Sequence, residues 1–271
     1  MKTLVGALCA VLLTLVPFVA AVAAPLKLVI HEESGAEGEP LPPISRYAAL
    51  RRAIETALTR PVEITLTRDR QRVYEWMERN QADVFMTNAA DLAARALTSL
   101  GYNFIATARP DVTVLFIGKG APVDNLKALS GFAISMPEPE TMFGQVCTAE
   151  LRDFIAKQYT ARASSEYAAV VYAVENNLSP VGCIPSHSRA RDTLQAKGIK
   201  VVYEGRPQPA LPVIASLGLP AADRAAIAKV LTNFEEGAAG DSALKSLGVT
   251  GFTEGGETRL RMLNSWLKGT K

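Results

Sequence analysis

The feature that most constrains the fold is a repeated alternation of short apolar segments with amphipathic segments. Runs such as 26–30, 82–86 and 181–184 are short and mostly apolar, and each contains Val or Ile, which is typical of buried strands. Between such runs, apolar residues recur at helical spacing, as over 47–58, where Pro61 then ends the pattern. Strands that alternate with helices predict an α/β fold with mostly parallel pairing.

The same pattern predicts how the chain divides. Two stretches rich in Gly and Pro, 118–122 and 205–209, bracket a segment that could fold as its own α/β unit. We therefore expect lobe 1 to comprise residues 24–117 plus 210–271, and lobe 2 to comprise 118–209, with two crossings between them. The run 112–117 is expected to be a strand of lobe 1, and 205–209 a linker. Ligands of open α/β sheets bind beyond the carboxyl ends of the strands, so we expect the site between the lobes.

The N-terminus predicts export. Lys2 precedes an uncharged apolar run over 4–24 that ends in Ala21-Val22-Ala23. A basic start, an apolar middle and a small-x-small exit are typical of a signal peptide, and we expect residues 1–23 to be cleaved. A retained membrane anchor is the alternative, because the run is long enough to span a bilayer. After cleavage we expect no stable membrane insertion, since no later stretch is long and apolar enough.

Charge and cysteine content give no reason to expect nucleic acid or a metal as a partner. The chain has 29 Lys and Arg against 27 Asp and Glu, a balance that gives no reason to expect nucleic acid as a partner. Beyond the leader two cysteines remain, Cys147 and Cys183. They could form a disulfide in an oxidising compartment, and two separately buried thiols are the alternative. Neither has metal-ligand spacing to the other or to a histidine, so we expect no metal and no cofactor.

The stretch Ser135–Gly144 is the best candidate for a ligand site. An apolar strand leads into it, Pro137 and Pro139 interrupt regular structure, and Thr141 is placed to cap the helix that follows. The free amides of a helix start carry partial positive charge and suit an anionic or strongly polar ligand. An ordinary strand-to-helix loop is the alternative.

Three segments carry a resemblance to a known family. Residues 82–88 (ADVFMTN), 124–134 (DNLKALSGFAI), and 168–174 with 181–182 follow one another at characteristic spacing. In that order they resemble segments of the type II periplasmic solute-binding proteins of ABC importers, within them the phosphonate/phosphite/phosphate-binding family. The resemblance covers nearly the whole chain after the leader. It implies two lobes of mixed sheets flanked by helices, two hinge crossings, and an oxyanion held by helix-start amides and hydroxyls.

The central loop departs from that family. Where the family has Ser-Thr-Ser-Gly, this chain has Thr141-Met142-Phe143-Gly144, so two hydroxyls are replaced by apolar side chains. Hydrogen bonds to a charged group are worth about 1.5–3 kcal/mol each, so this loss bears on the ligand class. Met142 and Phe143 would suit a ligand with an apolar or aromatic part beside its polar head.

The predicted ligand-binding residues combine these observations. His31, Thr87 and Asn88 follow predicted strands, while Ser165 and Tyr167 begin a later helix. A purely structural role, as core residue, helix cap or solvated loop, is the alternative for each. No catalytic or metal-binding residue is predicted. The full set is Thr87, Asn88, Thr141, Met142, Phe143, Gly144, Ser165, Tyr167 and His31.

The expected function is transport of a solute. We expect a periplasmic monomer that traps a small anionic ligand, phosphonate- or phosphate-like or an organic acid, and delivers it to an ABC permease. A periplasmic sensor that partners a membrane receptor, such as a sensor kinase, is the alternative, because both roles need the same closing cleft. A cysteine or serine hydrolase is disfavoured, since the chain has two histidines and no Gly-x-Ser-x-Gly elbow. We therefore expect no enzymatic activity.

Overall fold

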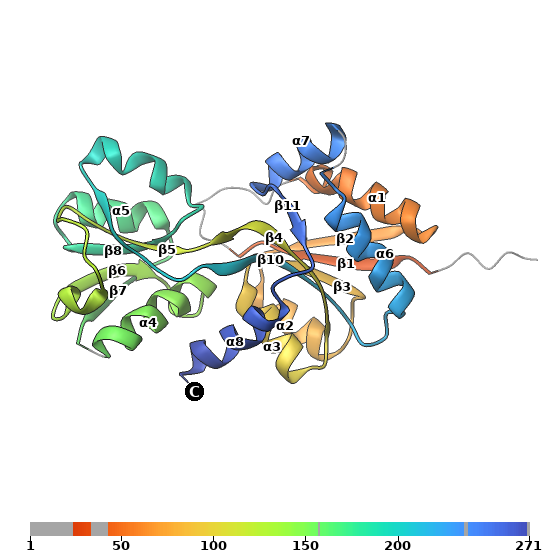
Figure 1. Cartoon of the computed structure of the whole chain (residues 1–271), viewed down its shortest axis with the longest axis horizontal. Coiled ribbons are helices and arrows are strands. Elements are labelled where there is room, and N and C mark those ends of the chain that lie inside the picture. Colours follow the sequence, from red (N-terminus) through yellow and green to blue (C-terminus); the bar gives the residue numbers. More distant parts are fainter. Residues whose placement is uncertain (1–23, 34–42, 157, 236–237, 270–271) are drawn as a thin grey trace, which may run out of the picture.

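Two β-sheets organise the chain, one of six strands and one of five (Figure 1). This computed structural model describes residues 24–33, 43–156, 158–235 and 238–269, and the predicted signal peptide, 1–23, lies outside them. Each sheet is flanked by its own helices and forms one lobe, so the predicted α/β fold with two lobes is confirmed. None of the helices within the described residues is long and apolar enough to cross a membrane.

The sheet of lobe 1 is mixed and has the order β11-β4-β10-β3-β1-β2. β1 pairs in parallel with β2 and β3, and β10 runs antiparallel to β3 and β4. His31 lies opposite Thr67 and Thr87, so the carboxyl ends of three adjacent parallel strands share one edge. The strands are β1 (Leu26–His31), β2 (Val62–Thr67), β3 (Val84–Thr87), β4 (Asn103–Val112), β10 (Gln208–Ala215) and β11 (Gly251–Thr253).

Helices cover both faces of this sheet because side chains alternate along its strands. Leu28 and Ile30 of β1 enter one apolar cluster with α1 and α6, whereas Val29 enters another with α3 and α8. A short 3-10 helix, Ile44–Tyr47, precedes α1. The helices of this lobe are α1 (Ala48–Leu58), α2 (Arg70–Glu78), α3 (Ala90–Ser99), α6 (Ala221–Thr232), α7 (Ala238–Leu247) and α8 (Glu257–Lys268).

The sheet of lobe 2 has the order β7-β6-β8-β5-β9 and is also mixed. Phe116 of β5 packs in the cluster that includes α4, while Leu115 packs with α5, so these helices cover opposite faces. The 3-10 helices are Leu126–Leu129, Arg189–Thr193 and Gln195–Lys197. The other elements are β5 (Val114–Gly118), β6 (Ala133–Pro137), α4 (Met142–Ile155), β7 (Thr160–Ser164), α5 (Tyr167–Glu175), β8 (Val181–Pro185) and β9 (Lys200–Glu204).

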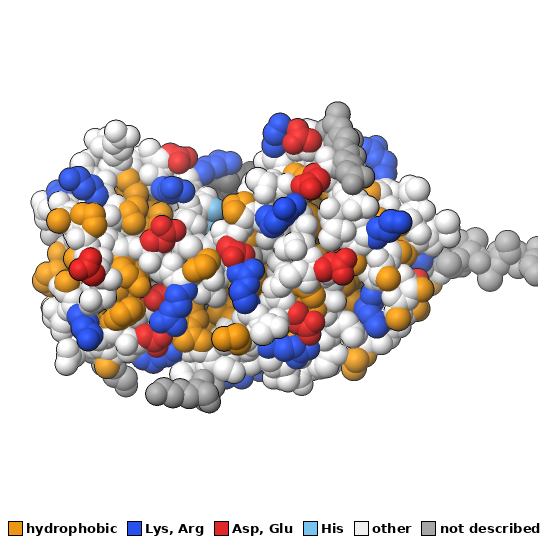
Figure 2. Space-filling view, in the orientation of Figure 1, with side chains coloured by type: hydrophobic (Ala, Val, Ile, Leu, Met, Phe, Trp, Pro, Cys, Tyr) orange, Lys and Arg blue, Asp and Glu red, His pale blue; other side chains and the backbone are white. Residues whose placement is uncertain are grey.

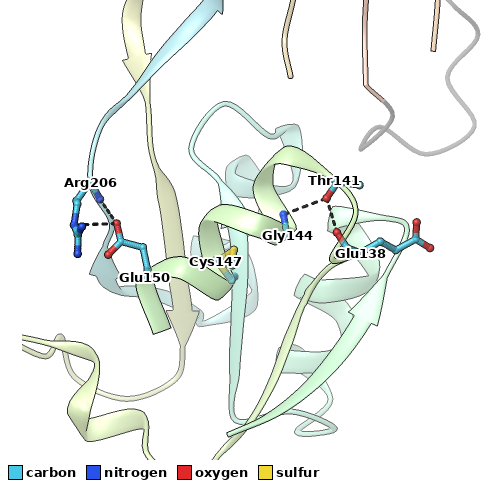
Figure 3. The surroundings of a disulfide bond; sticks show 7 residues. Glu138, Thr141, Gly144, Cys147, Glu150 and Arg206 are labelled. Carbon is cyan, nitrogen blue, oxygen red and sulfur yellow. Dashed lines mark hydrogen bonds and ion pairs between the residues drawn. A yellow bond between two sulfur atoms is a disulfide. The ribbon is translucent and has the colours of Figure 1, made fainter. Parts of the chain in front are cut away.

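A disulfide fixes α4 to its sheet. Cys147 in the middle of α4 is bonded to Cys183 of β8, with the two Cα atoms 6.4 Å apart (Figure 3). Of the two states that the sequence left open, the structure therefore has the disulfide rather than two free thiols.

The first crossing between the lobes lies upstream of the predicted boundary at 117/118. β4 ends at Val112 in the sheet of lobe 1, and β5 begins at Val114 in the sheet of lobe 2. The apolar run 112–117, expected in lobe 1, is therefore mostly a strand of lobe 2, where it lies between β8 and β9 and is buried on both faces. The return crossing is short, because β9 ends at Glu204 and β10 already begins at Gln208, inside the expected linker.

Candidate functional site

The two lobes meet at the carboxyl edge of β1, β2 and β3. Charged side chains follow each of these adjacent strands within four residues, and one after each strand belongs to the cluster at this edge: Glu33 after β1, Arg70 at the start of α2, and Asp91 in the first turn of α3. Facing them is the start of α4, which follows β6 of lobe 2. The parallel register brings the three charges together, as expected for the edge at which α/β sheets bind ligands.

Arg70 pairs with both carboxylates. Its Nη1 donates to Glu33 Oε1 at 2.6 Å and to Asp91 Oδ1 at 3.2 Å, and its Nη2 forms a close ion pair with Asp91 Oδ2. The side chains of Glu33 and Asp91 are only 9% and 10% exposed. Burial raises the pKa of Glu33, and the nearby charge of Asp91 adds to this, while Arg70 opposes it. With all three groups ionised, the cluster carries one excess negative charge.

The start of α4 reaches this cluster from lobe 2. Thr141 is the N-cap residue, as predicted: its Oγ1 accepts from the Gly144 amide at 3.1 Å and donates to the Glu138 carbonyl at 2.7 Å (Figure 3). The next amide, of Met142, donates across the lobes to Glu33 Oε2 at 2.7 Å. This amide is one of the orphan donors of a helix start, and a carboxylate satisfies it.

Gly144 is needed for this turn to close. A Cβ atom at that position would lie 1.9 Å from the Glu138 carbonyl oxygen, which is part of the backbone and cannot move aside cheaply. A second contact between the lobes follows one residue later, where Gln145 Nε2 donates to Asp91 Oδ2 at 3.1 Å. The first turn of α4 thus touches both acidic groups of lobe 1.

Three of the predicted residues, all in lobe 1, form hydrogen bonds at the strand ends beside this charged cluster. His31 is fully buried, and its Nδ1 lies 2.8 Å from Thr87 Oγ1, which also accepts from the Ala89 amide at 3.0 Å. Asn88 holds the backbone of Glu33, because its Oδ1 accepts from the Glu33 amide at 2.6 Å. Burial, followed by the charge of Arg70, lowers the pKa of His31 to about 4, so this histidine is neutral at pH 7.

Aromatic groups of lobe 2 lie beside the start of α4. The Phe143 and His187 ring centroids are 5.2 Å apart, and Tyr167 is half-buried. Burial raises the pKa of Tyr167, and the charge of Glu33 raises it further. Desolvation by the surrounding protein lowers the pKa of His187 to about 4, although this side chain keeps solvent-exposed surface. Figure 2 shows histidine surface in the hollow between the two lobes.

The predicted residues differ in how they contribute to the contact between the two lobes. The 141–144 turn contacts lobe 1 directly, His31, Thr87 and Asn88 support the charged cluster, and Ser165 is exposed just before α5. The Met142 and Phe143 side chains are buried in an apolar cluster that spans both lobes, so Met142 reaches the junction through its amide. The prediction missed Glu33, Arg70, Asp91 and Gln145. Glu33, Arg70 and Asp91 could have been found from the sequence, because a charged side chain follows within four residues after each of three parallel strands.

The sequence matches a model of a known protein family over most of its length. A family model described as "ABC transporter, phosphonate, periplasmic substrate-binding protein" matches residues 43–258. No curated protein matches the sequence.

Solved structures share the fold at low sequence identity. PhnD1 from Prochlorococcus marinus (MIT 9301), in complex with methylphosphonate, is 11% identical with a TM-score of 0.70, over 91% of this chain and 98% of that one. XAC2383 from Xanthomonas citri, bound to ATP, is 18% identical with a TM-score of 0.68, over 90% and 97%. The aliphatic sulphonate binding protein SsuA from Escherichia coli is 14% identical with a TM-score of 0.57, over 92% and 76%.

Proposed function

Because the chain belongs to the family of periplasmic substrate-binding proteins of phosphonate ABC transporters, we propose that it binds a small acidic solute between its lobes, at the start of α4. Members of this family are the solute-binding components of importers, so the partners are a small molecule and an ABC permease. In this proposal the protein acts in the periplasm as a monomer, catalyses no reaction and needs no cofactor.

One observation supports the position of the ligand. The Glu33 carboxylate lies between the Met142 amide of lobe 2 and the Arg70 guanidinium of lobe 1, at 2.7 and 2.6 Å. Its two oxygens stand in for the acidic head of a solute. The same donors, one from each lobe, would let such a head draw the lobes together, which is how ligands shift an open–closed equilibrium.

The donor set favours a singly charged head. The Thr141 hydroxyl already donates to the Glu138 carbonyl, and the Thr87 hydroxyl is fully buried beside His31, so neither is free to donate to a ligand. A doubly charged phosphate needs several strong donors, whereas a carboxylate or sulfonate is served by one amide and one guanidinium. The rings of Tyr167 and His187, which keep exposed surface, are suited to an apolar or aromatic body attached to that head, whereas the Phe143 ring is buried.

The proposal is tested with a panel of acids. Protein lacking the predicted leader is unfolded and refolded to remove bound solutes, then examined by thermal shift and calorimetry with benzoate, methanesulfonate, methylphosphonate and phosphate. We expect a monoanionic acid to raise the melting temperature more than phosphate does. If no acid in the panel raises it, binding of a small acidic solute is contradicted.

A backbone substitution tests the position. Met142 is the first helical residue, where proline is tolerated because its missing N–H is not needed by the helix. Met142→Pro removes the donor to Glu33, while Met142→Ala keeps it and controls for the lost side chain. We expect acid binding to be about tenfold weaker in Met142→Pro than in Met142→Ala, the effect of losing one hydrogen bond to a charged group. Equal affinities would remove this amide from the site.

A further inference from the structure

Glu33 occupies the very donors that the proposed function assigns to a ligand. We propose that Glu33 is a built-in competitor, whose carboxylate holds the empty protein closed and must be displaced before an acidic solute can bind. We call its contacts with the Met142 amide and Arg70 the Glu33 bridge. The competition rests on the proposed function, whereas the closing effect is a property of the empty protein alone.

The geometry of the Glu33 bridge is that of a bound ligand carboxylate. One oxygen accepts from lobe 2 and the other from lobe 1, and only 9% of the side chain is exposed. The backbone of Glu33 is fixed by Asn88, whose Oδ1 accepts from the Glu33 amide at 2.6 Å. Asn88 therefore presents the carboxylate to α4, and the Glu33 side chain is the part that must move when a solute arrives.

A solute acid and Glu33 exclude each other on electrostatic grounds. The cluster already holds two carboxylates against one guanidinium, since Asp91 also pairs with Arg70. A third negative charge at the Met142 amide would face both carboxylates at short range, and like charges that share a site disfavour the ionised forms. The amide offers one N–H, so a strong hydrogen bond to one acid is made instead of the other.

This competition sets a threshold for binding. The apparent affinity of a solute falls by the fraction of molecules in which its site is free, so a bridge that is formed nine times in ten weakens binding about tenfold. An acid that makes no contacts beyond its head group binds the shared donors little more tightly than Glu33 does, so it does not displace that carboxylate. An acid whose body also contacts the rings of lobe 2 can displace the carboxylate. Glu33 thus contributes to specificity without touching the bound solute.

The closing effect is tested on the empty protein by small-angle X-ray scattering. Glu33→Ala removes the bridge, and Glu33→Gln keeps the volume and a neutral acceptor if the alanine variant folds poorly. Glu32→Gln is the matched control, because Glu32 pairs with Tyr47 and Arg46 of its own lobe. We expect the radius of gyration to increase in Glu33→Ala, to increase less in Glu33→Gln, and to be unchanged in Glu32→Gln. Equal radii in the wild type and Glu33→Ala would overturn the proposal.

The competition is tested by calorimetry with benzoate and methylphosphonate. We expect Glu33→Ala to bind the preferred acid about tenfold more tightly than the wild type and the Glu32→Gln control. Unchanged affinity would show that Glu33 does not compete, and weaker affinity would show that it contacts the solute; either result overturns the competition while the proposed function stands. If no variant binds either acid, the proposed function fails, and the scattering result alone decides whether Glu33 closes the empty protein.

Discussion

The two ends of α4 are held in different ways. At its start, Met142 and Gln145 contact Glu33 and Asp91, which belong to the opposite lobe. In the C-terminal half of α4, which we call its far end, Glu150 is fully buried and one oxygen accepts from the Arg206 amide, 2.8 Å away in the return crossing (Figure 3). Figure 3 shows both ends, with Cys147 between them.

The far end is also tied to the last helix of the chain. Arg152 donates to the Leu267 carbonyl of α8 at 3.1 Å, and the Trp266 indole donates to Asp153 at 2.9 Å. Arg206 lies over the Trp266 ring, 4.8 Å from its centroid. Such contacts join α4 to the crossing and to lobe 1 without involving the ligand position.

This difference suggests how closure works. At the start of α4, the Met142 amide is bound by the Glu33 carboxylate, which in our proposal an acidic solute replaces. The contacts at the far end include a buried carboxylate and a backbone amide of the crossing, which have no such substitute. We infer that α4 keeps its far end in place while its start exchanges partners, as expected for closure around a hinge.

The largest expected effect comes from releasing the middle of α4 from its sheet. The Cys147–Cys183 disulfide closes a loop with a sequence separation of 36. Replacing both cysteines by Ala should lower the free energy of unfolding by about 4 kcal/mol, since the unfolded chain regains its loop entropy. Guanidinium denaturation measures this, with reduced wild-type protein as a parallel sample. A loss below about 1 kcal/mol would show that packing alone holds α4.

The next largest effect is expected from His31, through the pH dependence of folding stability. The pKa of His31 is lowered to about 4 from an ordinary value of 6.5, so the unfolded chain binds this proton first as the pH falls. His31 should therefore contribute full stability above pH 6.5 and lose about 3 kcal/mol of it as the pH falls to 4. Urea denaturation from pH 7 to 4 should show a shallower loss in His31→Gln, which does not titrate. Parallel curves for both proteins would contradict this assignment.

A smaller effect is expected at the far end of α4. Glu150→Ala leaves the Arg206 amide without its acceptor and should cost about 2 kcal/mol, the value of a hydrogen bond to a charged group. Glu150→Gln keeps an acceptor and removes the buried charge, so it should be tolerated far better in denaturation at pH 7.

The pH dependence sharpens this prediction. Burial raises the pKa of Glu150, so the folded protein holds that proton more tightly than the unfolded chain does. The stability due to this group is greatest below its unfolded pKa and is lost as the pH rises through the folded value. The stability of Glu150→Gln relative to the wild type should therefore increase with pH. A constant difference would show that Glu150 titrates normally.

The smallest effect is expected for the N-cap itself. Thr141→Ala should lower the free energy of unfolding by about 1 kcal/mol through loss of the bond to the Gly144 amide, and Thr141→Ser should restore it. Because this hydroxyl already donates to Glu138, acid affinity measured by calorimetry should change little. A tenfold loss of affinity in Thr141→Ala, recovered in Thr141→Ser, would show that the hydroxyl does contact the solute.

The elements that could be predicted from sequence are those with simple burial patterns. β3 and β5 are buried along their whole length and appear as continuous apolar runs. β4 was missed because its last four residues, 109–112, are partly or fully exposed and carry no apolar pattern. β11 was missed because it has only three residues.

Among the site residues, too, local contacts could be predicted from the sequence and tertiary contacts could not. The cap formed by Thr141 is a local contact between residues three apart, so the sequence predicts it. The contact between Glu33 and Met142 joins residues 109 apart and depends on how the two lobes meet. Arg70 and Asp91 are also brought together by strand order, which a single sequence does not specify. Local chemistry thus located the start of α4, and the groups that face it required the tertiary structure.

The most direct test of the account is two-dimensional ¹⁵N–¹H NMR of the protein during titration with benzoate. We predict that the Met142 amide signal shifts saturably in step with binding, because the solute replaces Glu33 as its acceptor. The Trp266 indole signal, at the far end of α4, should stay in place. Saturable binding that leaves the Met142 amide unmoved would contradict the central claim that the start of α4 receives the solute.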